Sequence, residues 1–72
     1  SFSKISVVGL GYIGLPTAAL IASKGINVVG LDIDEVVIKT INSGNVHIVE
    51  PHLDEMVKKV VNDKRLIATS TP

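Results

Sequence analysis

Three glycines, Gly9, Gly11 and Gly14, follow the first apolar run of the chain, and an acidic residue, Asp32, follows the second. A glycine turn between a strand and a helix leaves backbone N–H groups free to bind a diphosphate. An acid at the end of the next strand accepts hydrogen bonds from ribose hydroxyls. This pattern predicts a dinucleotide site. Because a carboxylate at position 32 would repel the 2′-phosphate of NADP, we predict NAD as the cofactor.

Each position of the turn has its own predicted role. Gly9 allows the tight turn out of the strand, Gly11 lets the backbone approach the diphosphate, and Gly14 lets the helix pack close to the strand. The amides of Tyr12 and Ile13, at the helix N-terminus, are expected to point toward the diphosphate, where the helix dipole favours negative charge. The predicted cofactor-binding residues are those of the turn and the acid: Gly9, Leu10, Gly11, Tyr12, Ile13, Gly14 and Asp32.

Other polar residues have structural interpretations. His47 and His52 lack further ligands at metal-binding spacing, so we expect both on the surface and predict no metal site. Glu50 stands directly before a proline and can serve a helix N-terminus. Asp34 is placed to cap a helix, which is also the alternative interpretation of Asp32. We assign no catalytic residue within these 72 residues.

The composition excludes several classes of protein. Seven basic and seven acidic residues are scattered along the chain, and with one Tyr and one Phe there is neither a basic stripe nor an aromatic platform for nucleic acid. There is no cysteine, hence no disulfide and no cysteine nucleophile. No apolar run approaches the length that crosses a bilayer, and no signal peptide is recognisable, so we expect no membrane partner and a cytoplasmic protein.

Apolar periodicity and turn residues divide the chain into six elements. Strands are predicted over 4–10, 26–31 and 65–69, helices over 12–24, 34–44 and 51–61, and a loop over 45–50. In the last helix, Asp54 with Lys58 and Glu55 with Lys59 are predicted ion pairs, four residues apart. The strand runs are continuously apolar, as in parallel sheets buried on both faces.

The order strand, helix, strand, helix, helix, strand predicts an α/β fold. Right-handed crossovers place the second strand beside the first and the third outside the second. This is half of a Rossmann-type doubly wound parallel sheet, in which the first strand has a fourth strand on its other side. We therefore expect an open edge at the first strand, and a homo-oligomer formed through this edge or in a larger parent protein.

Several segments together resemble the UDP-glucose/GDP-mannose dehydrogenase family of nucleotide-sugar oxidising enzymes. The similar segments, in the family's order, are Gly-Leu-Gly-Tyr-Ile-Gly-Leu-Pro at 9–16, Leu-Asp-Ile-Asp at 31–34, Ile-Asn-Ser-Gly at 41–44 and Glu-Pro-His-Leu at 50–53. Within the family, residues 47–51 are most similar to members that oxidise UDP-N-acetyl-D-mannosamine. The resemblance covers essentially the whole chain. Many members carry Lys or Arg where this chain has Val37, so the resemblance does not carry over the family's second adenosine contact to this position.

The resemblance implies that residues 1–72 are the N-terminal part of an NAD-binding Rossmann domain, with the remainder of the enzyme absent. The parent would oxidise the C6 alcohol of a UDP-sugar to a carboxylate with two NAD in succession. A cysteine would trap the intermediate aldehyde. The product would be a precursor of bacterial surface polysaccharide. That cysteine, a catalytic lysine and the sugar site would lie beyond position 72, so the 72 residues alone are expected to be inactive. The alternatives are a standalone dinucleotide-binding or dimerising module without catalysis, and a flavoprotein or another sugar-nucleotide enzyme with the same turn.

Overall fold

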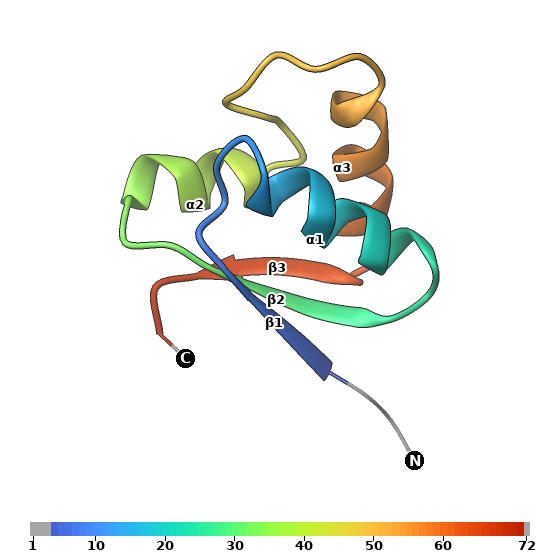
Figure 1. Ribbon diagram of the computed structural model, residues 1–72, viewed down its shortest axis with the longest axis horizontal. Helices are drawn as coiled ribbons and strands as arrows, with labels where there is room; N and C mark the ends of the chain where they lie inside the picture. The colour runs from blue at the N-terminus through green and yellow to red at the C-terminus, as the bar shows by residue number, and fades with distance from the viewer. Residues whose placement is uncertain (1–3, 72) are drawn as a thin grey trace.

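Three strands form one parallel sheet in the computed structural model, which describes residues 4–71. Strand β1 (Lys4–Val8) pairs with β2 (Asn27–Leu31), and β2 pairs with β3 (Leu66–Thr69), so that the spatial order is β1-β2-β3. The predicted strand order and the α/β fold class are confirmed. The strands end at one edge of the sheet, where the chain leaves β1 for the glycine turn and β2 for the next helix (Figure 1).

Helix α1 (Gly14–Ser23) begins two residues later than predicted, because the turn extends to Ile13. Its alanines allow close packing, and Ala18, Ala19 and Ala22 are buried. The helix ends at Ser23, and Gly25 follows it with a φ of +89°, the left-handed conformation that only glycine adopts at little cost. The predicted stop at Gly25 is confirmed, and β2 follows at once.

Helix α2 (Glu35–Asn42) is capped as the sequence indicates. The Asp34 carboxylate accepts hydrogen bonds from the amides of Val36 at 2.9 Å and Val37 at 3.4 Å. The acidic Glu35 lies in the first turn, where it complements the helix dipole. Gly44 follows the helix with a φ of +85°, so the prediction that it terminates the helix is confirmed.

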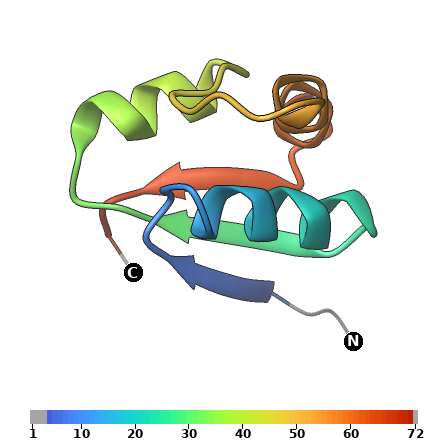
Figure 2. The ribbon, with the colours of Figure 1, turned by 45° about the horizontal axis from the view of Figure 1, so that its top comes forward.

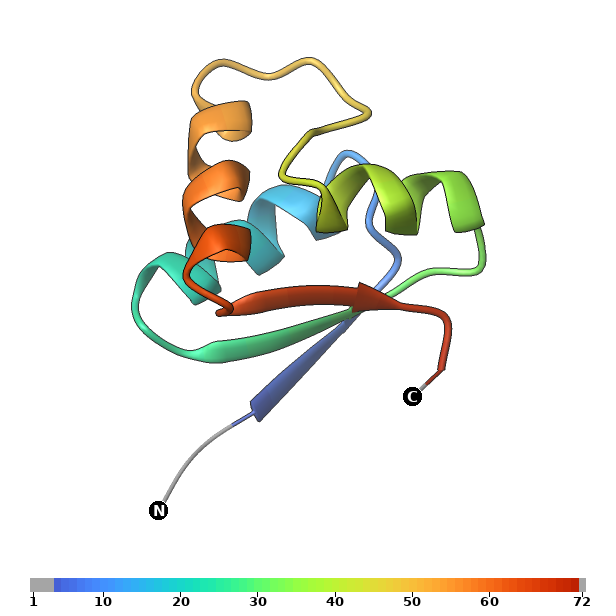
Figure 3. The ribbon, with the colours of Figure 1, turned by 180° about the vertical axis from the view of Figure 1, so that it is seen from behind.

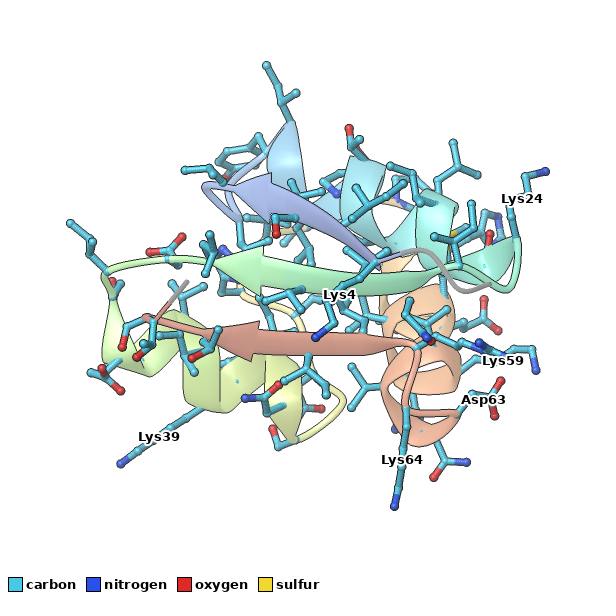
Figure 4. The ribbon with its side chains drawn as sticks, turned by 90° about the horizontal axis from the view of Figure 1, so that it is seen from below. Lys4, Lys24, Lys39, Lys59, Asp63 and Lys64 are labelled. Atoms are coloured by element: carbon cyan, nitrogen blue, oxygen red, sulfur yellow. The ribbon has the colours of Figure 1, made fainter. Side chains whose placement is uncertain are left out.

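Helix α3 (Leu53–Asn62) departs from its prediction in its start and in its ion pairs. It begins at Leu53 rather than at position 51, because His52 adopts a left-handed φ of 66° that a continuous helix cannot contain. The predicted ion pairs from Asp54 and Glu55 to the lysines four residues on are not among the salt bridges of residues 4–71. Instead, Lys59 Nζ lies 3.1 Å from Asp63 Oδ2, at the end of the helix (Figure 4).

All three helices cover the same face of the sheet (Figure 2). One apolar core fills the space between the layers, and Leu15, Ile41, Val57 and Leu66 are among its fully buried side chains. Figure 4, seen from below, shows the strands in front of the helices. On this uncovered side the apolar residues Val8 and Ile67 are 81% and 54% exposed. The structure is therefore half of a doubly wound fold, with helices on one side only.

No helix formed by residues 4–71 is both long enough and apolar enough to span a membrane.

Candidate cofactor site

The glycine turn is held between the ends of β1 and β2. Gly9 has a φ of +85°, which allows the chain to reverse directly after β1, and its amide donates to the Leu31 carbonyl at 2.8 Å. At Gly14 a Cβ would overlap the carbonyl oxygen of Gly9, so the first turn of α1 rests directly on the backbone of the turn. The predicted role of Gly9 in turning is thus confirmed, and the close approach that Gly14 allows is to the Gly9 backbone just beyond β1.

Backbone amides in the turn face a hollow rather than a protein acceptor. Among residues 4–71, the amides of Gly11, Tyr12 and Ile13 donate no hydrogen bond to a backbone or side-chain group. A Cβ at Gly11 would meet no atom within 4 Å. Tyr12 and Ile13 are themselves 73% and 83% exposed. An anion can approach the backbone here.

The N-terminus of α1 also lacks the capping side chain or the acidic residues that are found at the start of the other two helices. It has no side-chain cap and no acidic residue in its first turn. Helix α2 has a side-chain cap, and α3 has acidic residues in its first turn. Unpaired N–H groups at a helix start carry partial positive charge. The start of α1 is therefore the one helix N-terminus, within residues 4–71, whose positive end has no acidic partner from the protein.

Asp32 lies directly after β2 and bridges three parts of the site. Its Oδ2 accepts the Leu10 amide at 3.0 Å, and its Oδ1 accepts the Asp34 amide at 2.9 Å. Its own amide donates to the Thr69 carbonyl, at the end of β3, at 3.1 Å. The carboxylate is partly buried at the mouth of the sheet. Each of its oxygens has a second lone pair that is free to accept a further hydrogen bond.

The environment of Asp32 favours the ionised form. The Asp34 amide, followed by the Leu10 amide, lowers the pKa of this carboxyl below its ordinary value of 3.8. The opposing effect of partial burial is smaller, and the His47 imidazole adds a minor lowering of the same pKa. Asp32 is therefore a carboxylate at neutral pH, whose oxygens accept hydrogen bonds.

Leu10 serves the site differently from its neighbours in the turn. Its amide is already bonded to Asp32, and its side chain is fully buried. The side chain rests on β2 at Gly30, where a Cβ would come within 2.7 Å of the leucine methyl group. Sequence reasoning did not single out Gly30. Leu10 thus anchors the turn to β2 through both its backbone and its side chain.

Two adjoining hollows open at the carboxyl ends of the strands, and they share Val8 and Gly9. The first, of about 350 Å³, lies beside Asp32. Its lining consists of residues at or just past the ends of the three strands: Val8, Gly9, Leu31, Asp32, Ile33 and Ser70. The second, of about 550 Å³, is lined by residues 7–9, 11–14 and Thr17, along the free amides. Val8 and Gly9 thus line both hollows.

Sequence reasoning missed Val8, Ile33 and Ser70 as lining residues. The signal that could have found them is their position at or just beyond the carboxyl ends of parallel strands, where ligands of this fold class bind. Val8 and Ile33 are 81% and 95% exposed, so they offer apolar surface to a flat ring beside Asp32.

The two histidines and Glu50 remain outside the site. All three are exposed, as was predicted for the histidines, and His52 Nδ1 lies 3.3 Å from Glu55 Oε1. Within residues 4–71, no three His, Cys, Asp or Glu side chains are grouped so that they could hold a metal ion. The loop between α2 and α3, which contains His47, lies on the helical side of the sheet (Figure 3).

Comparison with known proteins identifies the family of this chain. The sequence profile of the UDP-glucose/GDP-mannose dehydrogenase family, NAD binding domain, matches residues 3–72. The chain belongs to this family. The resemblance predicted from the sequence is thereby confirmed, and so is NAD as the cofactor of the domain.

Relatives within the UDP-glucose/GDP-mannose dehydrogenase family are similar over the whole chain. The UDP-N-acetyl-D-mannosamine dehydrogenase of Campylobacter jejuni is 56% identical over 71 residues, which cover 99% of this chain and 17% of the relative. An NDP-N-acetyl-D-galactosaminuronic acid dehydrogenase of Ralstonia nicotianae is 54% identical over 71 residues, with the same coverage of both chains.

A solved structure gives the same result for the fold. The UDP-N-acetyl-mannosamine dehydrogenase of Staphylococcus aureus superposes with a TM-score of 0.93 at 43% identity, over 97% of this chain and 17% of that one. The chain thus spans about a sixth of the length of the relatives that it matches. Its fold is the Rossmann-type fold of these dehydrogenases.

Proposed function

We propose that residues 1–72 are the first part of the NAD-binding Rossmann domain of a UDP-sugar dehydrogenase. The proposed cofactor-binding residues are those of the turn and the acid: Gly9, Leu10, Gly11, Tyr12, Ile13, Gly14 and Asp32. The observation that carries this proposal is the bond between Asp32 and the Leu10 amide. It joins the carboxylate and the glycine turn into one rigid unit, beside amides that have no protein partner.

In this proposal the NAD diphosphate binds to the amides of Gly11, Tyr12 and Ile13, at the positive end of α1. Asp32 accepts hydrogen bonds from the adenosine ribose through its remaining lone pairs. Leu10 holds the turn in place and does not donate to the phosphate, since its amide is already bonded to Asp32. The bound NAD would supply the hydride acceptor. The residues of this chain bind and orient the cofactor, and none of them is proposed to act on the sugar.

We propose UDP-N-acetyl-D-mannosamine as the substrate of the whole enzyme. Two NAD would be consumed as the C6 alcohol becomes the carboxylate of UDP-N-acetyl-D-mannosaminuronate, a precursor of bacterial surface polysaccharide made in the cytoplasm. The support is the likeness of residues 47–51 to members with this substrate, together with the name of the Campylobacter jejuni relative. Formation of NADH by the full-length protein, compared for the N-acetylmannosamine, N-acetylgalactosamine and glucose nucleotides, tests this choice.

Titration of the isotopically labelled chain with NAD tests the cofactor site directly. We expect millimolar NAD to shift the amide resonances of residues 11–14, while amides of α3, which is remote from the turn, stay unchanged. NADP should shift them less, because the Asp32 carboxylate repels its 2′-phosphate. The same titration of the full-length protein is the control, because the rest of the domain can supply NAD contacts that these 72 residues do not make. Absence of these shifts in both proteins would contradict the site, whereas absence in the short chain alone would show that the half-site needs the rest of the domain.

A second candidate function, a dimerising module, is favoured by the outer edge of β1. The Gly9 amide faces β2, so the alternate positions Ser6 and Val8 direct their backbone groups to the outside. An unpaired edge of this kind is a template for another strand. Proline at Ser6 would block the edge without removing a bond to β2. We expect Ser6→Pro to reduce the self-association of the chain in sedimentation. A tight dimer that Ser6→Pro abolishes would favour this candidate, and a chain that is monomeric at every concentration would exclude it.

A further inference from the structure

Asn42, the last residue of α2, binds the backbone of β3 with both ends of its side-chain amide. Its Nδ2 donates to the Ala68 carbonyl at 2.8 Å, and its Oδ1 accepts the Ala68 amide at 2.8 Å. This pair of bonds is the one that a neighbouring strand would make. Asn42 lies 26 positions before Ala68 in the sequence, so the contact joins two elements through the tertiary fold.

Ala68 presents these backbone groups to the outer edge of the sheet. Val28 donates to the Arg65 carbonyl at 2.7 Å and Asp32 donates to the Thr69 carbonyl at 3.1 Å, so alternate residues of β3 face β2. The residues between them, Leu66 and Ala68, direct their N–H and C=O groups away from β2. Since β3 is the last strand in the order β1-β2-β3, that direction is the free edge.

The strand is short, and Ala68 stands near its middle. Of the two residues that face outward, Ala68 is bonded to Asn42, and its residue surface is 3% exposed. Burial of an unpaired peptide group would be costly, and the side-chain amide removes this cost. A strand from another molecule would have to displace Asn42 before it could pair with β3. At β1, in contrast, no side chain among residues 4–71 bonds to the outward-facing backbone groups.

We propose that Asn42 takes the place of a neighbouring strand at β3 and closes this edge to strand addition. Strands from a second copy of the chain are thereby directed to β1. The proposal does not depend on the cofactor, because it uses only contacts between α2 and β3. It gives the Ile-Asn-Ser-Gly segment at 41–44 a physical role that the cofactor site does not explain.

Hydrogen exchange in the full chain tests whether the edge is closed. In the unmodified chain we expect the Ala68 amide to exchange on the order of tenfold or more slowly than the Leu66 amide, each relative to its own unstructured rate. Asn42→Ala should remove this difference and leave the Asp32 amide, which faces the interior of the sheet, protected. Asn42→Asp keeps an oxygen acceptor for the Ala68 amide but sets a carboxylate oxygen against the Ala68 carbonyl oxygen, so it should retain only part of the Ala68 protection.

Asn62→Ala is the matched control, because Asn62 is the last residue of α3 as Asn42 is of α2, and it is exposed. This variant should leave the exchange of Ala68 unchanged. Equal exchange of Ala68 and Leu66 in the unmodified chain would overturn the proposal, even if Asn42→Ala does not fold.

Sedimentation then tests the consequence for pairing. In a Ser6→Pro background, where β1 is blocked, the chain with Asn42 should remain monomeric, and the additional change Asn42→Ala should restore association that rises with concentration. Ser6→Pro with Asn62→Ala should stay monomeric. A protein that is equally monomeric with and without Asn42, or that pairs equally well in both forms, would contradict closure of the edge.

Discussion

Gly14→Ala is expected to destabilise the chain by about 3 kcal/mol or more and to abolish cofactor binding, although alanine is the better helix former. The new Cβ would overlap the Gly9 carbonyl oxygen and lie 2.8 Å from the Gly9 carbonyl carbon. Both are backbone atoms, and the Gly9 amide is tied to Leu31. The turn therefore cannot move aside without losing that bond. For a domain of this size, such a loss is a large part of the total stability.

Gly11→Ala is the matched control for Gly14→Ala. A Cβ at Gly11 would meet nothing within 4 Å, so stability should change by less than about 0.5 kcal/mol. The same Cβ would stand where the diphosphate approaches, so NAD affinity should fall. Denaturant unfolding measures the stability of both variants, and NAD titration measures their affinity for NAD. If Gly14→Ala unfolds at the same denaturant concentration as the unmodified chain, the close contact with Gly9 does not govern the turn.

Local signals were sufficient to predict the six elements and their order. Gly25 and Gly44 end their helices in left-handed conformations, and Asp34 caps α2, because each of these effects depends on a few neighbouring residues. The topology followed from the right-handed crossover, which nearly all such connections adopt. The α/β half-fold could therefore be derived without knowledge of any long-range contact.

Errors occurred where residue type and spacing do not decide between alternative local conformations or partners, or where a tertiary contact is involved. Helix α3 starts at Leu53 because the preceding His52 is left-handed, and no residue type at this position indicates that conformation. Lys59 pairs with Asp63 rather than with Glu55, since a surface ion pair is worth less than about 1 kcal/mol and one alternative is easily exchanged for another. The bonds of Asn42 to Ala68 depend on tertiary structure, which periodicity does not report.

In the candidate site, too, some features could be predicted from the local sequence and others depend on the tertiary fold. The glycine spacing and the acid identified the residue types, because the backbone conformation of the turn requires them. The bond from Leu10 to Asp32 could not be derived in this way, since it depends on how far the turn reaches over the end of β2. This bond changes the interpretation of Asp32. It is both a proposed ribose acceptor and a structural anchor of the turn, so its substitution should affect stability as well as binding.

Asp32→Asn is expected to lower the free energy of unfolding by about 1–3 kcal/mol at pH 7. The two carboxylate oxygens accept two different amides, those of Leu10 and Asp34. A side-chain amide has one oxygen, so its NH₂ group would face one of these N–H donors. NAD affinity should fall on the order of ten- to hundredfold, because a charged hydrogen-bond acceptor is lost. The preference for NAD over NADP should narrow, since the repulsion of the 2′-phosphate is removed.

The pH dependence identifies the carboxylate as the cause. The Asp34 and Leu10 amides lower the folded-state pKa of Asp32 below its ordinary value of 3.8, which is also its expected value in the unfolded chain. The stability that the carboxylate contributes is therefore fully present above 3.8 and is lost as the pH falls through the lower folded pKa. The difference in unfolding free energy between the unmodified chain and Asp32→Asn should be constant near neutral pH and shrink in acid.

Asp34→Asn, two positions away, is the control that separates this effect from the loss of a negative charge. The Asp34 side chain uses a single oxygen, Oδ1, to accept both the Val36 and the Val37 amides. Asparagine can keep both bonds and is an equally good helix cap, so stability should change by only a few tenths of a kcal/mol. NAD binding should be retained. Equal destabilisation by Asp32→Asn and Asp34→Asn would show that the bonds from the Leu10 and Asp34 amides to Asp32 do not hold the glycine turn in place. The proposal that Asp32 and the turn form one unit would then be wrong.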